Sequence, residues 1–309
     1  MELNRYTAPC DCGAVLRLWE DTFGAAEAAL EAPQLDGSEN AHNLDILYLA
    51  TEGDTLLGTI HATIPHNCPT IAGLSGMCTA PAARGTGLGR ILFTKILEEI
   101  DSLGVEVSYL GTGNPIAAKL YHSLGFSFLP GSNVMVRYKR GDTVDFTHRV
   151  FDPTPTDVQL TPGSPALRIP LIPLVLHRGS LKVLDRNTAL MSSREMLQAS
   201  CMGLYPRYAA LPGFWGAVSG SGVLGAIASI APADSGETVA DFFCCDSFAD
   251  TVPALLDTCR IHGASCLHIA DHDTVKQSLV RKLGYRPCEA TTIRIGAFTL
   301  PAKVYRKDL

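Results

Sequence analysis

The chain has 309 residues, a length that accommodates two domains of ordinary size. Hydrophobic residues make up 46% of the sequence and charged residues 18%, which is typical of a globular protein with enough apolar material for a core. The formal net charge of -6 argues against a protein that binds nucleic-acid backbones, because such proteins need clustered Lys and Arg.

Neither export nor membrane insertion is indicated. The segment Met1–Arg5 lacks a basic start followed by an apolar region. The uncharged stretch 214–233 is long enough for a membrane helix, but its middle, Ser219-Gly-Ser-Gly222, is typical of a turn. We interpret the stretch as two strands joined in a hairpin and predict a cytoplasmic protein.

The ten cysteines and nine histidines do not indicate disulfides or a metal. The pairs Cys10/Cys12 and Cys244/Cys245 lack the C-x₂-C spacing of a zinc site, and no histidine pair has metal-ligand spacing. We therefore expect mostly buried thiols in a reducing cytosol, and no metal.

The first half of the chain alternates strand and helix patterns. Hydrophobic runs predict strands over 44–51, 55–65, 70–79, 105–110, 126–128 and 133–138. A glycine-rich turn over 81–89 leads into an amphipathic helix that stops at Gly104. A second helix begins with Asn114 as its N-cap and Pro115 in its first turn, and ends at Gly125.

The second half weakly repeats the first, after a Pro-rich stretch over 139–165 that we interpret as a linker or crossover. At a shift of 159 residues, matched pairs are Gly104 and Gly263, Leu120 and Leu279, Leu124 and Leu283, and Gly125 and Gly284; at a shift of 167, Gly58 matches Gly225 and Pro65 matches Pro232. This order predicts an internal repeat of a whole α/β domain.

The glycine-rich turn Arg84-Gly85-Thr86-Gly87-Leu88-Gly89 is the first chemical signal. Glycines let backbone N–H groups approach an anion, and the N-terminus of the following helix adds its positive dipole end. A pyrophosphate would fit there, although an ordinary turn is an equal alternative. The spacing matches neither a Walker loop nor a dinucleotide fingerprint.

The second signal is the helix from Asn114 to Phe126. Asn114 and Tyr121 are seven residues apart, so they share one helix face, and Tyr121 could give a phenolic proton to a leaving group. Taken alone, the helix favours the alternative in which Tyr121 packs in the core and Asn114 is only a cap.

Together the two signals resemble the GNAT acetyltransferase family over about 44–138. The matching positions are Arg84, Gly87, Gly89, Asn114, Ala117, Leu120, Tyr121, Gly125 and Phe126. The resemblance implies two tandem GNAT-like domains, each a mostly antiparallel, splayed mixed sheet flanked by helices. We expect a catalytic domain over 1–145 and a degenerate copy over 146–309.

The resemblance also implies a site for acetyl-CoA as co-substrate. The backbone of Met77, Cys78 and Thr79 would pair with pantetheine. The loop Arg84, Gly85, Thr86, Gly87, Leu88, Gly89 and Arg90 would hold the pyrophosphate. Asn114 and Ala117 would lie against the cofactor arm, and Tyr121 would protonate the departing thiolate.

The general base and the acceptor are less defined. Many relatives place a Glu or Asp that acts as the general base on the strand before the loop, but the strand 70–79 has none. His61 on the preceding strand is therefore the candidate base. The alternatives are that His61 only packs in the sheet, or that water relays the proton. Residues 11–45 carry eight acidic residues against Arg17 alone, which favours a small cationic amine, or is simply a solvated surface.

The second copy lacks the first copy's chemistry. At the shift of 159, Arg84, Gly87, Gly89 and Tyr121 become Phe243, Asp246, Phe248 and Val280. A carboxylate and a bulky ring would oppose a pyrophosphate.

The chain is thus predicted to be an acetyl-CoA-dependent N-acetyltransferase that transfers acetyl directly to a small-molecule acceptor. The alternatives are an acyl-CoA decarboxylase or S-acyltransferase on the same fold, and a non-catalytic CoA-binding sensor. The protein could also form a homodimer, which the sequence does not decide.

Overall fold

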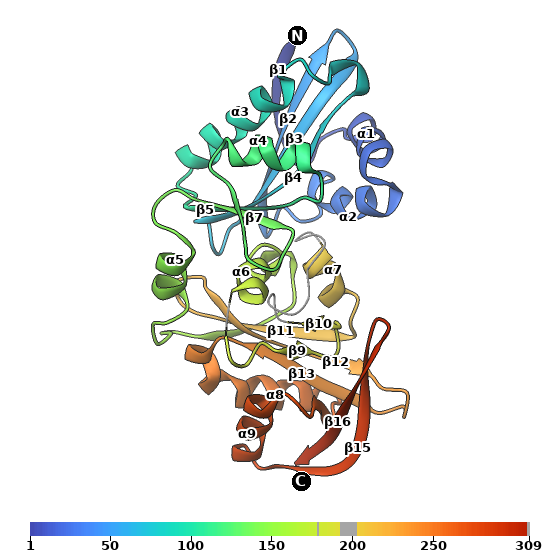
Figure 1. Cartoon of the computed structure of the whole chain (residues 1–309), viewed down its shortest axis with the longest axis vertical. Coiled ribbons are helices and arrows are strands. Elements are labelled where there is room, and N and C mark those ends of the chain that lie inside the picture. Colours follow the sequence, from blue (N-terminus) through green and yellow to red (C-terminus); the bar gives the residue numbers. More distant parts are fainter. Residues whose placement is uncertain (178, 192–202, 308–309) are drawn as a thin grey trace.

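The computed structural model describes residues 1–177, 179–191 and 203–307 and contains one seven-stranded sheet in each half of the chain (Figure 1). A two-stranded sheet of β9 (Leu184–Asp185) and β10 (Leu190–Met191) accompanies them. The first sheet has the order β1-β2-β3-β4-β5-β7-β6. Its strands are β1 (Glu2–Thr7), β2 (Asn43–Glu52), β3 (Thr55–Pro65), β4 (Ile71–Thr79), β5 (Val107–Gly111), β6 (Ser127–Phe128) and β7 (Val134–Tyr138).

The second sheet repeats this order, as β8-β11-β12-β13-β14-β16-β15. Its strands are β8 (Gln159–Pro162), β11 (Gly213–Val218), β12 (Leu224–Pro232), β13 (Thr238–Cys244), β14 (Cys266–Ala270), β15 (Tyr285–Ile295) and β16 (Phe298–Lys307). In each sheet only the central pair is parallel, β4 with β5 and β13 with β14. The predicted fold class, two mostly antiparallel mixed sheets flanked by helices, is confirmed.

Helices cover both faces of the first sheet. On one face lie α1 (Gly13–Phe23) and α2 (Ala25–Leu35), which pack on Leu47. On the other lie α3 (Leu88–Ser102) and α4 (Pro115–His122), which pack on the neighbouring Ile46 and Tyr48. Successive strand residues point to opposite faces of the sheet, so β2 contributes buried side chains to the helix layers on both faces.

The helices of the second half match those of the first at a shift of 159 residues only from the end of α8 onward. They are α6 (Leu171–Leu176), α7 (Leu204–Ala209), α8 (Val252–Ile261) and α9 (Thr274–Lys282), with short 3₁₀ turns η2 (Pro165–Leu167) and η4 (Asp246–Thr251). Strand β14 lies at the shifted position of β5, and α9 at that of α4. Gly104 and Gly263 both have positive φ, 89° and 97°, at the helix ends where only glycine is unstrained.

Two local expectations have clear outcomes, and one strand was not expected. The hairpin over 214–233 is confirmed as β11 and β12, and no helix in the described part of the chain is long and apolar enough to cross a membrane. The linker over 139–165 is wrong in part, since it contains α5 (Thr143–Val150) with a capping box at Asp142. Strand β1 was not predicted; it pairs with β2 and is mostly exposed, so its apolar pattern is weak.

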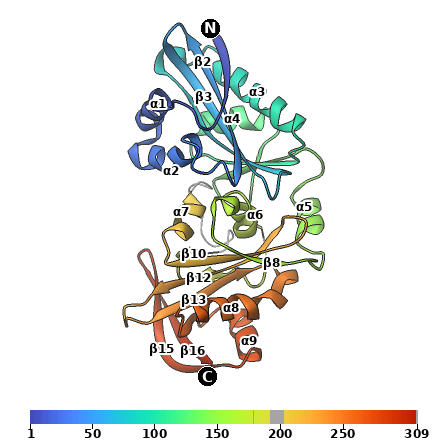
Figure 2. The same cartoon turned by 180° about the vertical axis from the view of Figure 1, so that it is seen from behind.

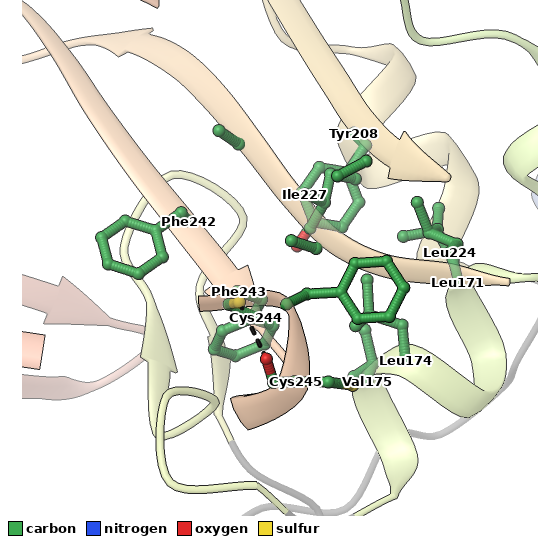
Figure 3. Close-up of a cluster of buried hydrophobic side chains, with 14 of the residues drawn as sticks. Leu171, Leu174, Val175, Tyr208, Leu224, Ile227, Phe242, Phe243, Cys244 and Cys245 are labelled. Atoms are coloured by element: carbon green, nitrogen blue, oxygen red, sulfur yellow. Dashed lines mark hydrogen bonds between the residues drawn. The ribbon is translucent and has the colours of Figure 1, made fainter. Parts of the chain in front are cut away.

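The two halves share one hydrophobic core. The layer between the sheets contains α5, α6 and α7 (Figure 2). Leu171, Leu174 and Val175 of α6 lie beside Leu224 and Ile227 of the second sheet (Figure 3). The same buried cluster includes side chains of the first half: Cys68, Ile71, Val107, Tyr109, Leu129, Val134, Val136, Phe146 and Phe151.

Polar contacts also join the two halves of the chain. The Tyr109 hydroxyl lies 3.2 Å from Nε2 of buried His177. Burial, with a smaller contribution from the nearby Lys182, lowers the pKa of His177 to about 3, so this imidazole is neutral at physiological pH. The Arg168 guanidinium forms a buried bidentate ion pair with Glu39.

Candidate functional site

The central feature of the first half is an open edge on β4. Strands β4 and β5 pair only from Ile71 to Gly73, although β4 continues to Thr79. Beyond Gly73 the strands diverge, and the β4 backbone faces a gap. Met77, Cys78 and Thr79, predicted to pair with pantetheine, lie on this open stretch.

A glycine makes the bend in β4 possible. Gly76 has φ of 57°, and the pairing with β3 shifts register beside it. A Cβ at Gly76 would lie 2.2 Å from Cζ2 of Trp19, so the α1 tryptophan packs directly on the backbone. The indole Nε1 donates to Oγ1 of Thr59, which in turn donates to the carbonyl oxygen of Gly76. These contacts hold the bend in place.

The glycine-rich loop follows β4 and presents unpaired donors. Gly85 and Gly87 have φ of 78° and 87°, in the region that favours glycine. Among the described residues, no acceptor bonds the backbone N–H of any residue from Gly85 to Gly89. The loop is mostly exposed and ends at the N-terminus of α3. Such a cluster of N–H groups at a helix start favours an anion.

The loop residues differ in how they are held. Thr86 donates its hydroxyl to the carbonyl oxygen of Ala83, and Leu88 is buried in the α3 core. The Arg84 Nε donates to the carbonyl oxygen of Thr79, and Arg90 donates to Oγ of Ser123. Both arginines are exposed, so their charge lies beside the unpaired amides.

Helix α4 follows β5, the strand that diverges from β4. Asn114 is its N-cap, with Oδ1 accepting from the N–H of Ile116 and of Ala117. This confirms the predicted cap, and it leaves the exposed Asn114 amide donors without a partner in the described chain. Ala117 is partly buried on the same helix.

Tyr121 is buried on α4, with its ring centroid 4.9 Å from that of Phe93. Within the described residues its hydroxyl makes no hydrogen bond. Burial raises the pKa of Tyr121 to about 12, with a smaller contribution from Cys78 on β4. The phenol is therefore protonated at neutral pH and lies near the strand edge.

His61 lies on β3 with no exposed surface. Its Nε2 lies 3.1 Å from Oδ1 of Asp45, and its Nδ1 lies 2.9 Å from Oγ of Ser75. An acceptor could reach this imidazole only through these neighbours. Its catalytic role stays a prediction.

Two residues of this network were missed by the sequence analysis. Ser75 Oγ donates to Oε2 of Glu31 at 2.6 Å, which brings a carboxylate of α2 to β4. Glu31 was counted among eight acidic residues, but nothing in the sequence separates it from the others. Of those eight, Glu39 and Asp45 are buried and paired, while most of the rest are exposed.

In the second half, the chain itself fills the equivalent gap. Strands β13 and β14 pair only at Val239 and Ala240, and Leu181 forms an antiparallel bridge with Cys244 beyond them. Because β12 pairs with Cys244 on the other side, Leu181 lies on the edge that faces β14. The segment continues as β9 (Leu184–Asp185), where Nζ of Lys276 on α9 donates to the carbonyl oxygen of Leu184.

The loop of the second half is also replaced. Oδ1 of Asp246 accepts from the N–H and the hydroxyl of Ser180, at 3.0 and 2.8 Å. Phe248 packs where a side chain on Gly225 would lie. The predicted pairs of Arg84 with Phe243, Gly87 with Asp246 and Gly89 with Phe248 were wrong. Helix α8 has 10 residues where α3 has 15, so the shift of 159 does not extend back through this helix. Phe243 lies buried inside β13, and Asp246 and Phe248 lie in η4, before α8.

No group of His, Cys, Asp or Glu side chains in the described residues has the geometry of a metal site. All cysteines in the described part of the chain are free thiols, and burial raises the pKa of most of them, as for Cys244 and Cys259.

Several solved structures are similar to part of this chain. No curated protein matches the sequence. Among solved structures, an aminoglycoside 6'-acetyltransferase type Ii is 20% identical, with 46% of this chain and 99% of that chain covered and a TM-score of 0.37. An aminoglycoside 6'-N-acetyltransferase complexed with coenzyme A is 19% identical (46% and 100% covered, TM-score 0.37), and the Enterococcus faecium enzyme is 18% identical (46% and 100% covered, TM-score 0.36).

The family model carries the assignment. Residues 13–126 match the model of the Acetyltransferase (GNAT) family. This range includes the open edge of β4, the glycine-rich loop and the Tyr121 helix. The chain therefore contains, over residues 13–126, an acetyltransferase domain of the GNAT family.

Proposed function

We propose that the protein transfers an acetyl group from acetyl-CoA to a small amine, with the chemistry in residues 1–145. The observation that carries this proposal is the run of unpaired N–H groups from Gly85 to Gly89 beside the open edge of β4. The loop would bind the pyrophosphate, with Arg84 and Arg90 adding charge. The pantetheine arm would pair with Met77, Cys78 and Thr79, and pass Asn114 and Ala117.

Transfer would be direct, from the thioester to the acceptor nitrogen. The amine lone pair attacks the carbonyl carbon, and the C–S bond breaks as the tetrahedral intermediate collapses. Tyr121, protonated at neutral pH, gives its proton to the departing sulfur.

Residues 146–309 would serve as a scaffold that binds no CoA. The segment from Ser180 to Asp185 already occupies the equivalent gap, and Asp246 presents a carboxylate in place of donors. The proposed domain boundary after residue 145 falls inside α5. It therefore separates the two proposed roles and does not mark a linker between two folded units. A cytoplasmic location fits the free thiols and stays part of this proposal.

An assay of CoA release tests the proposal. The purified chain would be incubated with acetyl-CoA and a panel of amines that includes spermidine and kanamycin, with malonyl-CoA in a parallel series. Amine-dependent CoA release supports acetyl transfer. Loss of CO₂ from malonyl-CoA without amine dependence would support the decarboxylase alternative, and binding without turnover would support the sensor.

The Tyr121→Phe variant tests the proposed acid. It keeps the ring that packs on Phe93 and removes only the hydroxyl, so we expect kcat to fall by about 10²-fold or more while acetyl-CoA affinity stays close to that of the parent. Steady-state kinetics and calorimetry measure the two quantities. Unchanged turnover would leave Tyr121 with a packing role only.

A further inference from the structure

A chain of hydrogen bonds crosses the first sheet from its core to its surface. Asp45 on β2 contacts His61 on β3, His61 contacts Ser75 on β4, and Ser75 donates to Glu31 on α2. The Ser75 hydroxyl donates to Glu31, and the two ring nitrogens of His61 lie within hydrogen-bond distance of Ser75 and Asp45.

The exposed end of this chain is Glu31. Its side chain keeps 13% of its surface exposed, whereas His61 and Asp45 have 0% and 1%. Ser75 occupies Oε2 of Glu31, and Oε1 has no hydrogen-bond partner in the described chain. One carboxylate oxygen is therefore held in place by Ser75, and the other makes no hydrogen bond within the described chain.

Glu31 lies at the apex of the open gap. Gly73 is the last β4 residue that pairs with β5, and Ser75, the partner of Glu31, comes two residues later. The glycine-rich loop lies at the far end of β4, after Thr79. An arm that leaves the loop and follows this edge brings its reactive end back toward Ser75.

The second half closes the apex from the other side. A Cβ at Gly73 would lie 2.4 Å from Cδ1 of Ile169, which shows that this residue packs on the strand where it diverges. Its neighbour Arg168 pairs with Glu39 and stacks 4.5 Å from the Tyr205 ring centroid. An acceptor at the apex would thus contact groups of both halves.

We propose that Glu31 is the general base that takes a proton from the ammonium group of the acceptor, and that Ser75 and His61 position its carboxylate. This inference rests on the proposed acetyl transfer. It also replaces His61 as the base, because both ring nitrogens of this imidazole are within hydrogen-bond distance of protein groups and the side chain has no exposed surface.

The proton balance of the step is complete. The acceptor R–NH₃⁺ gives one proton to Oε1 of Glu31, and the amine forms the N–C bond as the carbonyl becomes tetrahedral. The C–S bond then breaks, and sulfur leaves with the Tyr121 proton. The second nitrogen proton restores the phenol, and Glu31 releases its proton to water.

The charges that face Glu31 predict a pH dependence. Burial raises the pKa of Glu31, while His61, the Ser75 hydrogen bond and Arg168 lower it, and Glu27 one turn earlier raises it; the net direction is upward. Asp45 lies behind His61 on β2. Because only the ionised carboxylate accepts a proton, activity should be lost as pH falls through this raised pKa.

Three variants test the proposal: Glu31→Gln, Ser75→Ala and, as a matched control, Glu27→Gln on the exposed part of the same helix. CoA release from acetyl-CoA would be measured from pH 5 to 9, with spermidine as the amine and with water as the acceptor when no amine is added. Acetyl-CoA binding and thermal unfolding would be measured for each protein.

Glu31→Gln is expected to lower kcat/KM at pH 7 by about 10²-fold or more and to remove the acidic limb of the pH profile, with acetyl-CoA binding retained. Ser75→Ala should move that limb to higher pH, because it removes a hydrogen bond that favours the carboxylate. Glu27→Gln should keep kcat and move the limb slightly to lower pH.

Two results would overturn the role of Glu31: an acidic limb that persists in Glu31→Gln, or a limb unmoved by Ser75→Ala. A purely structural role predicts lower thermal stability with an unchanged profile. If the parent protein fails to bind acetyl-CoA, the proposed function itself is wrong, which these measurements distinguish from a failure at Glu31.

Discussion

Replacing Gly87 with Asp should abolish acetyl-CoA binding. Gly87 is the N-cap of α3, with φ of 87° and ψ of -2°, and nothing lies within 4 Å of a Cβ added there. The loss would therefore come from charge and not from a steric clash. The new carboxylate would accept hydrogen bonds from the nearby unpaired N–H groups, as Asp246 accepts one from the N–H of Ser180 in the second half. Its negative charge would also repel the pyrophosphate.

Calorimetry measures this effect against two references. The parent chain should bind acetyl-CoA at one site, and Gly87→Ala, which has the same left-handed backbone without the charge, should bind more weakly but measurably. A non-glycine residue in the left-handed conformation costs about 1–2 kcal/mol. Gly87→Ala therefore measures the effect of backbone strain alone, and the further loss in Gly87→Asp measures the effect of the charge. Two equivalent sites in the parent, or normal binding by Gly87→Asp, would contradict our account.

The isolated first half, cut after Asp152, should bind acetyl-CoA but lose acceptor turnover and aggregate. Every proposed contact to the cofactor lies within it. However, its part of the shared core would lose partners in the second half, as Tyr109 would lose His177. Each large apolar side chain contributes about 1.5–3 kcal/mol when buried, so the newly exposed apolar surface would favour association between fragments.

Size-exclusion chromatography and the CoA-release assay measure the outcome. As a matched control, residues 153–309 would be produced together with 1–152 as a separate chain, which should restore solubility if the interface re-forms. A monodisperse and fully active first half would show that the second half has a separate role.

The local elements of the fold could be predicted because their signals lie within a few residues. The Asn114-Pro115 pair predicts the start of α4, and the pattern after the loop predicts the buried face of α3. The repeat was predicted from glycines at helix ends, since Gly104 and Gly263 need a positive φ that other residues adopt only with strain. Strand β1 escaped prediction because its side chains are mostly exposed and only its pairing with β2 defines it.

The sequence by itself thus determined the glycine loop, the Tyr121 helix and the tandem order of the elements, because spacing along one chain sets each of them. The tertiary structure alone decided which groups meet. Glu31 and Ser75 are 44 residues apart, and their contact exists only because α2 packs across β4. Likewise, Leu181 precedes Cys244 by more than sixty residues, and only folding places it in the gap where the first half stays open. Contacts of this range depend on how layers pack, which no local periodicity encodes.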